Sequence, residues 1–165
     1  SSDLGPILFP QQRTGRDGTV FRCLKFRTMR LGAHAQQEAL RALSIQDGPA
    51  FKIPKDPRLT RIGGFLRRYS LDELPQLFNV LFGTMSLVGP RPPIPGEVAR
   101  YAWWQRRRVS VKPGLTCLWQ VVGRNRVPFQ RWVEMDLHYI DNWSFWLDAA
   151  LLARTLPAVL RGTGM

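Results

Sequence analysis

The stretch Ser70-Leu71-Asp72-Glu73-Leu74-Pro75-Gln76-Leu77-Phe78-Asn79 places two adjacent carboxylates between two helical patterns. Before it, apolar residues recur at the spacing of one helix face, at Ile62, Phe65, Leu66 and Tyr69. The same spacing returns within and after it, at Leu74, Leu77, Phe78 and Leu81. The sequence therefore predicts two helices that meet at residues 70–73, with both carboxylates at their junction.

The start of the second helix has two interpretations. Ser70 and Glu73 fit a capping box, in which the serine caps the first turn and the glutamate reaches back. Pro75 argues against it, because a helix that began at Ser70 would need an N–H at position 75. A proline also disfavours helical angles at the residue before it, here Leu74. With Asp72 as the cap, Pro75 would lie in the first turn, where no N–H is needed.

A carboxylate at this junction can act as a nucleophile. An aspartate has an ordinary pKa of about 3.9, so at neutral pH it needs no general base. Attack of Asp72 on a phosphoryl group would give an acyl phosphate, which a second phosphate can resolve. Arg67 and Arg91 can offset the negative charge with bidentate geometry, and Glu73 is the natural ligand for Mg²⁺. The alternative is an ordinary helix start without chemistry.

The composition indicates one domain with an anionic partner. The 165 residues include 24 Lys and Arg against 12 Asp and Glu, which gives a net charge of +12. Nucleic acid, phosphorylated small molecules and an anionic membrane surface all fit that charge, and six Trp favour the membrane. No apolar run is long enough to predict a spanning helix. Cys23 and Cys117 lie far apart without nearby ligands, which argues against zinc.

The N-terminal part predicts a β-hairpin followed by a loop region. Runs of apolar residues at 7–12 and 20–26 flank a turn that contains Asp17-Gly18. Lys25 and Arg27 leave the second strand on one face, either as a protective charged edge or as a phosphate contact. Residues 36–43 predict a short helix, and residues 44–59, rich in proline, predict a loop.

The C-terminal part predicts mainly helices. We expect helices around 98–108, over 129–142 and from Ser144 to Leu160, with an extended segment at 115–122. Pro157 should kink or shorten the last helix, which is expected to turn Leu147, Leu151 and Leu152 inward. The aromatic cluster at its start is either part of the core or inserted into a membrane interface. It consists of Trp143, Phe145 and Trp146.

Several long motifs together resemble the bacterial sugar transferase family, the monotopic polyprenol-phosphate phosphoglycosyl transferases. The central motif runs from Ser70 to Leu81 and continues in Met85-Ser86-Leu87-Val88-Gly89-Pro90-Arg91-Pro92. Upstream, the similarity includes Phe9-x-Gln11-x-Arg13-x-Gly15 and Lys25-Phe26-Arg27-Thr28-Met29. Downstream, it includes Lys112-Pro113-Gly114-Leu115-Thr116, Leu118-Trp119-Gln120-Val121, Gly123-Arg124, Asp136, Tyr139 and Asn142-Trp143-Ser144.

The resemblance implies an activity and a set of site residues. The family transfers a sugar phosphate from a UDP-sugar donor to undecaprenyl phosphate and releases UMP, as a first step of exopolysaccharide assembly. Asp72 is then the nucleophile that forms an aspartyl-phosphosugar, with Glu73 beside it and Mg²⁺ held by both. Substrate contacts are expected from Lys25, Arg27, Arg67, Pro90, Arg91, Gln120 and Arg124.

The resemblance also implies a fold and a location. We expect residues 1–165 to form one catalytic domain, a compact, mainly helical α/β domain with a small β-hairpin and sheet. The family is monotopic, so we expect the domain on the anionic cytoplasmic face of the bacterial inner membrane, with a hydrophobic re-entrant hairpin preceding Leu4. The resemblance does not decide whether the domain forms a homodimer.

Two positions depart from the family pattern. Thr84 stands where the family usually has Asp, and Cys117 stands where it usually has Gly. Both are expected to alter metal or substrate affinity without touching the Asp-Glu pair. A nucleic-acid-binding module or a non-catalytic membrane-surface module would also explain the charge. No zinc, RNA-recognition or helix-turn-helix signature supports nucleic-acid binding, and no nucleic-acid partner is expected.

Overall fold

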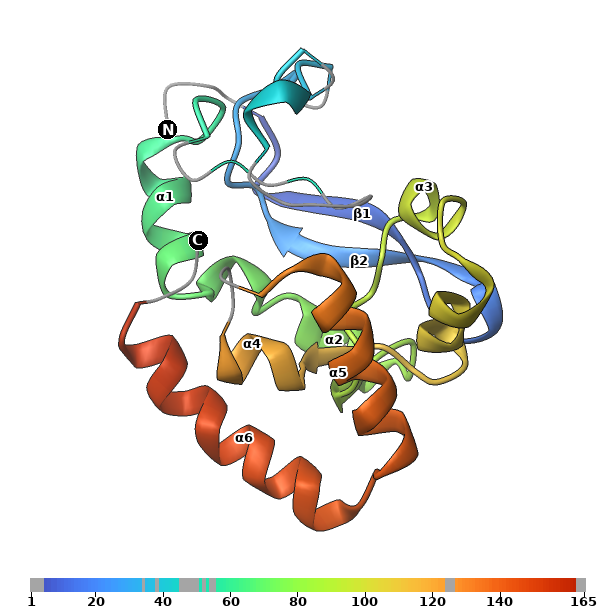
Figure 1. Ribbon diagram of the computed structural model, residues 1–165. Coiled ribbons are helices and arrows are strands. Elements are labelled where there is room, and N and C mark those ends of the chain that lie inside the picture. The colour runs from blue at the N-terminus through green and yellow to red at the C-terminus, as the bar shows by residue number, and fades with distance from the viewer. Residues whose placement is uncertain are drawn as a thin grey trace.

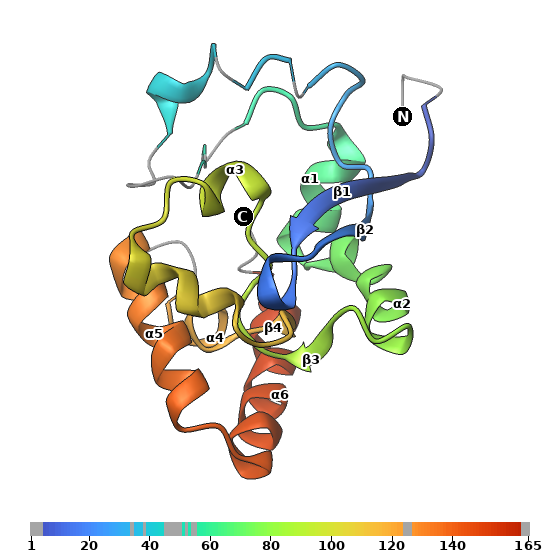
Figure 2. The ribbon, with the colours of Figure 1, turned by 90° about the vertical axis from the view of Figure 1, so that its right-hand side faces the viewer.

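Two small sheets and a set of mostly short helices make up the fold (Figure 1). The computed structural model describes residues 5–33, 35–37, 39–44, 51, 53, 56–123 and 127–162. Strands β1 and β2 lie on one side of the molecule, and helices α5 and α6 lie on the other (Figures 1 and 2). The predicted α/β class, mainly helical with a small hairpin and sheet, is confirmed for these residues.

The first sheet is the predicted hairpin. β1 (Leu8–Thr14) pairs antiparallel with β2 (Val20–Phe26), and the 3-10 turn η1 (Arg16–Gly18) connects them. Asp17 and Gly18 both have positive φ angles, 56° and 79°, which aspartate and glycine tolerate better than most residues. The sequence Asp17-Gly18 therefore sets the turn, as predicted.

The two predicted helices meet at a separate tight turn. α1 (Arg61–Arg68) ends just before the 3-10 turn η3 (Leu71–Glu73), and α2 (Gln76–Leu81) follows. The Ser70 side chain makes no capping hydrogen bond, so the capping box is absent, as Pro75 suggested. The expectation that Asp72 caps the second helix is wrong, because Asp72 lies inside η3.

Leu74 also differs from expectation, since its backbone angles are helical (φ −53°, ψ −38°). Short-range hydrogen bonds explain how the chain passes through the proline. The Leu74 N–H donates to the Leu71 carbonyl, and the Leu77 N–H donates to the Leu74 carbonyl. Neither bond needs an N–H on Pro75, so the helical course continues across it.

The second sheet is short and parallel. β3 (Ser86–Val88) pairs with β4 (Gly114–Thr116), with Ser86 opposite Gly114. A Cβ at Gly114 would lie 2.1 Å from the Gly89 nitrogen, so only glycine permits this close approach. The predicted extended segment at 115–122 is wrong beyond β4, because α4 (Leu118–Val122) is helical. Leu118 and Val121 pack on the core from one face of that helix, and this packing overrides the strand preference of Val121.

Two further helix predictions need correction. The single helix expected around 98–108 is two elements, α3 (Pro95–Val98) and the 3-10 helix η4 (Trp103–Val109). Within residues 36–43, the described part forms turns and the 3-10 helix η2 (Arg41–Leu43). No residue of η2 is buried, so no packed face supports a longer helix there. The predicted loop at 44–59 lies largely outside the described residues.

The C-terminal helices were predicted well. α5 (Phe129–Asp141) and α6 (Phe145–Leu160) form as expected, and the Ser144 hydroxyl accepts a hydrogen bond from the Leu147 N–H. α6 continues past Pro157, so the proline does not shorten it. Leu147 and Leu151 pack inward, but Leu152 is exposed, contrary to expectation.

The aromatic cluster of Trp143, Phe145 and Trp146 is exposed, so its interpretation as a core cluster is wrong. Two other clusters form the core. Tyr101, Phe129 and Val133 make one, and Val88, Tyr139 and Leu151 make the other. Among the described residues, no helix is both long and apolar enough to cross a membrane.

Asn79 joins the hairpin to the rest of the molecule. Its side-chain oxygen accepts from the Leu24 N–H at 2.9 Å, and its side-chain nitrogen donates to the Arg22 carbonyl at 2.8 Å. These are bonds that a neighbouring strand would make to β2. Thr84 exchanges hydrogen bonds with Asn79 and does not line the cavity described below. This departure from the family pattern therefore contacts Asn79 rather than the Asp-Glu pair.

We expect Asn79→Ala to lower the free energy of unfolding by about 2–4 kcal/mol, because it leaves the Leu24 N–H and the Arg22 carbonyl unpaired. Denaturant unfolding measures the loss. Asn142→Ala is the matched control, since Asn142 is exposed and, within the described part of the chain, its side chain bonds to His138 alone. Equal losses in the two variants would contradict the role given to Asn79.

Candidate active site

A large cavity brings most of the predicted site residues together. It has a volume of about 1150 Å³ and lies among the hairpin, η3, the segment after β3, and helices α4, α5 and α6. The lining includes seven of the predicted residues, namely Lys25, Arg27, Arg67, Asp72, Glu73, Arg91 and Gln120. Pro90 is buried outside the lining, where its carbonyl accepts from the Gly114 N–H. Arg124 lies outside the described residues.

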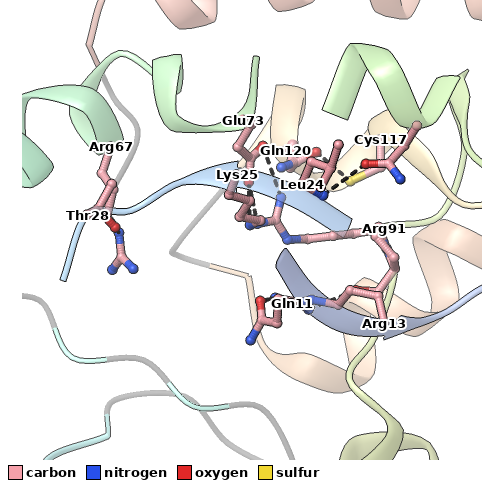
Figure 3. Close-up of polar contacts among 12 residues, drawn as sticks. Gln11, Arg13, Leu24, Lys25, Thr28, Arg67, Glu73, Arg91, Cys117 and Gln120 are labelled. Atoms are coloured by element: carbon pink, nitrogen blue, oxygen red, sulfur yellow. Dashed lines mark hydrogen bonds and ion pairs between the residues drawn. The ribbon is translucent and has the colours of Figure 1, made fainter. Parts of the chain in front are cut away.

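Glu73 is shared by two cations from different parts of the chain. Its Oε1 accepts from the Lys25 Nζ at 3.1 Å and from the Arg91 Nη2 at 2.6 Å, as Figure 3 shows. Its Oε2 lies 3.4 Å from the Arg91 Nη1. The three side chains are largely buried. Although burial opposes ionisation, Arg91 and Lys25 hold the pKa of Glu73 well below its usual range.

Asp72 has a different environment from its neighbour. Asp72 is 8% exposed, and within the described part of the chain its carboxylate accepts no hydrogen bond. Burial raises the pKa of Asp72, and the charge on Glu73 adds to this effect. Lys25, Arg67 and Arg91 act in the opposite direction and favour the ionised form. Asp72 is therefore a poorly solvated carboxylate with free oxygens, and at neutral pH it can attack an electrophile.

Arg67 supplies a cation that the Glu73 cluster does not use. Its Nε donates to the Thr28 hydroxyl at 2.9 Å, and Figure 3 shows it to one side of Glu73, Lys25 and Arg91. Its two terminal nitrogens have no hydrogen-bond partner among the described residues. Thr28 thus holds the stem of the guanidinium group while the outer edge stays available for a bidentate anion, such as a phosphate.

The two carboxylates differ in how well they fit Mg²⁺. The described residues contain no cluster of three or more His, Cys, Asp or Glu that could hold a metal by itself. Mg²⁺ takes only one or two carboxylates where substrate phosphates complete its ligands. Asp72 has free oxygens, whereas both oxygens of Glu73 face cations. Of the two predicted ligands, Asp72 offers the better fit.

The other predicted contacts have structural partners as well. Arg27 donates to the carbonyls of Pro6 and Gly5. The Gln120 Oε1 accepts from the Cys117 thiol at 3.1 Å. Cys117 is fully buried, and burial raises the pKa of its thiol well above the ordinary value. This departure from the family pattern therefore touches Gln120, which lines the cavity.

Sequence reasoning gave no role to Arg13, which positions the segment that carries Arg91. The Arg13 Nη1 donates to the Pro92 carbonyl at 2.8 Å. The Arg13 Nε and Nη2 both donate to the Gln11 Oε1. The Gln11-x-Arg13 spacing, with side chains on one face of a strand, was the available signal. It did not show which part of the chain the arginine contacts.

Comparison with known proteins shows which family this chain matches. A model of the family described as bacterial sugar transferase matches residues 1–162. The UDP-galactose-lipid carrier transferase of Erwinia amylovora is 47% identical over 99% of this chain and 35% of its own length. The undecaprenyl-phosphate galactose phosphotransferase of Salmonella typhimurium is also 47% identical, over 98% of this chain and 35% of its length.

A shorter relative is covered more completely. The exopolysaccharide production protein ExoY of Sinorhizobium fredii is 42% identical over 99% of this chain and 74% of its own length. The chain thus spans about a third of the length of the first two relatives and about three quarters of the third.

The site predicts opposite stability changes in two conservative variants. The raised pKa of Asp72 means that its ionisation opposes folding, a cost that is absent well below pH 4 and fully present at neutral pH. Asp72→Asn removes this cost, so we expect a Tm that is higher by roughly 1–3 °C at pH 7. Glu73 has a lowered pKa, so its stabilisation is present above its ordinary pKa and is lost in acid.

Glu73→Gln should lower the free energy of unfolding by about 2–4 kcal/mol at pH 7, because it leaves Lys25 and Arg91 buried without a counter-charge. Calorimetry of the two variants beside the unaltered protein gives both values. Destabilisation of the Asp72 variant, or an unchanged Glu73 variant, would contradict this description of the site.

Proposed function

The chain belongs to the bacterial sugar transferase family, and from this premise we propose that it transfers a sugar 1-phosphate from a UDP-sugar to undecaprenyl phosphate. The names of its relatives support this choice of donor, acceptor and polysaccharide product. The observation that carries the proposal is the free carboxylate of Asp72 in a cavity with an unshared guanidinium edge on Arg67.

We propose a reaction in two displacements. In the first, an Asp72 oxygen attacks the phosphorus that bears the sugar, the P–O bond to the other phosphate breaks, and UMP leaves with the electron pair. The product is an acyl phosphate that joins Asp72 to the sugar phosphate. In the second, an oxygen of undecaprenyl phosphate attacks the same phosphorus, and the bond between this phosphorus and the Asp72 oxygen breaks. The carboxylate is regenerated and the polyprenyl diphosphosugar is released.

The surrounding charges explain how a carboxylate can approach a diphosphate. Lys25, Arg67 and Arg91 carry three positive charges against the two negative charges of Asp72 and Glu73, so the pocket attracts an anion. Among the described residues, the two terminal nitrogens of Arg67 have no hydrogen-bond partner, so they can donate to the phosphate oxygens. Phosphoryl transfer is catalysed mainly by such placement of charge, because little other covalent chemistry is required.

Glu73 acts on this pocket indirectly. By accepting from Lys25 and Arg91 it holds both cations in place, and it occupies donors that could otherwise form a direct ion pair with Asp72. A Mg²⁺ ion, held by Asp72 and substrate phosphate oxygens, would supply further neutralisation of the diphosphate.

We also propose that the domain works on the cytoplasmic face of the inner membrane. Trp143, Phe145 and Trp146 are exposed around the start of α6, and the Phe145 and Trp146 rings contact each other. The amphipathic tryptophan rings suit a headgroup region. The net charge of +12 favours an anionic leaflet. A membrane location would place the site near its polyprenyl acceptor.

Intact-mass analysis tests the covalent step. After incubation with UDP-galactose and Mg²⁺, we expect the protein to gain the mass of a hexose phosphate and to release UMP. Hydroxylamine should remove the adduct, because it cleaves acyl phosphates. Asp72→Asn should form no adduct, and Asp141→Asn, which changes an exposed aspartate paired with Arg107, should form it normally. Chelation of the metal is expected to suppress the reaction.

An adduct that survives in Asp72→Asn would contradict the assignment of the nucleophile. If neither UDP-galactose nor UDP-glucose gave an adduct or UMP, the transferase proposal would fail. Tight, strongly salt-dependent binding to duplex DNA under the same conditions would then favour the nucleic-acid alternative.

A further inference from the structure

A further carboxylate lines the cavity, on the short helix α3. This helix packs against β1 (Figure 1), and Glu97 lies on the cavity wall together with Ile94 and Gly96. The Glu97 Oε2 accepts from the Ile94 N–H at 3.4 Å, which is long for a hydrogen bond. This contact fits the start of a helix, where a glutamate reaches back to the capping residue, but it uses only one of the two oxygens.

The other oxygen of Glu97 is accessible and unused. Within the described part of the chain, Oε1 accepts no hydrogen bond and Glu97 forms no ion pair. Among the same residues, the buried side-chain oxygens and nitrogens without a partner all belong to other side chains, so the Glu97 Oε1 retains accessible surface. Because Glu97 lines the cavity, a ligand there can reach this oxygen.

The charges around Glu97 place its carboxylate on the inner side of the wall. Burial raises the pKa of Glu97, and three arginines, Arg13, Arg108 and Arg91, oppose the rise. All three line the cavity, and they come from the hairpin, from η4 and from the segment after β3. A carboxylate turned out toward bulk water would be neither desolvated nor close to these three side chains.

The three arginines do not satisfy Glu97 directly. In the described structure none of them donates to its carboxylate, because each has other partners. Arg91 is held by Glu73, and Arg108 is held by Asp136. The charge of Glu97 is thus offset from a distance, while its Oε1 still lacks a donor. This part of the cavity therefore offers an acceptor to a ligand.

An acceptor of this kind fits a hydroxyl group better than a phosphate. A carboxylate repels a diphosphate, but it accepts from hydroxyl groups, as acidic residues do with ribose in dinucleotide-binding domains. We propose that Glu97 binds ring hydroxyl groups of the donor, on its hexose or its ribose. The inference rests on the proposed function, in which the diphosphate lies at the Asp72 end. Arg91 acts on the pKa of both carboxylates, which places Asp72 and Glu97 near one arginine.

Isothermal titration with a glutamine variant tests the proposal. The ligand, used with Mg²⁺, is an α,β-methylene analogue of UDP-galactose, in which CH₂ replaces the bridging oxygen so that transfer cannot occur. We expect Glu97→Gln to weaken its binding about fivefold to tenfold, because a charge-assisted hydrogen bond becomes a neutral one. The variant keeps an oxygen for the Ile94 N–H. Glu134→Gln is the matched control, because Glu134 pairs with Arg131 and does not line the cavity.

An aspartate variant separates contact from charge. Glu97→Asp keeps the negative charge but withdraws the carboxylate from the cavity, so a hydroxyl contact predicts weaker analogue binding in this variant as well. If the analogue bound more tightly to Glu97→Gln and equally well to Glu97→Asp, the proposal would be overturned. Glu97 would then act on the phosphates through its charge alone.

UDP and pyrophosphate show which part of the donor is bound. Equal weakening of UDP and the analogue in Glu97→Gln supports the ribose, and unchanged UDP affinity with a weakened analogue supports the hexose. Pyrophosphate has no sugar hydroxyl, so an equal loss for pyrophosphate would overturn the proposal. Unchanged analogue affinity in both Glu97 variants would overturn the inference and leave the proposed function intact. If the unaltered protein bound neither the analogue nor UDP, the proposed function would fall together with the inference.

Discussion

The shared ion pair of Glu73 with Lys25 and Arg91 is the interaction on which the site depends. It joins the end of β2, the turn η3 and the segment after β3, three parts of the chain that are distant in sequence. Arg13 supports the same segment through the Pro92 carbonyl, and Asn79 fastens β2 to α2. Because the cations of the cluster are satisfied by Glu73, the adjacent Asp72 stays unpaired in the cavity that these elements enclose.

Adjacent residues of similar chemistry thus acquire different roles from their surroundings. Glu73 is stabilised in its ionised form by two contacts, whereas Asp72 is buried beside a like charge and lacks a hydrogen bond. The first arrangement favours a fixed structural charge and the second favours a reactive one. Such a site loses some folding free energy where chemistry is required.

The sequence predicted what local patterns control. Apolar spacing located α1, α2, α5 and α6, and Asp17-Gly18 located the hairpin turn. The proline argument excluded the capping box but missed the 3-10 turn, because short-range hydrogen bonds allow helical angles at Leu74. Most site residues were named through the family motifs, yet the partners of Glu73, the strand-like bonds of Asn79 and the stacking of Trp119 on Trp132 depend on tertiary contacts that no local pattern encodes.

The most direct test of this account is the order in which the two adjacent carboxyl groups titrate. Selective ¹³C labelling of Asp and Glu side chains, with Asp72→Asn and Glu73→Gln used for assignment, allows NMR to follow each group. The account predicts that the pKa of Asp72 lies above the ordinary value of about 3.9 and that Glu73 stays ionised well below its ordinary pKa of 4.5 for as long as the protein is folded. A Glu73 that protonates at or above 4.5, or before Asp72 as the pH falls, would contradict it.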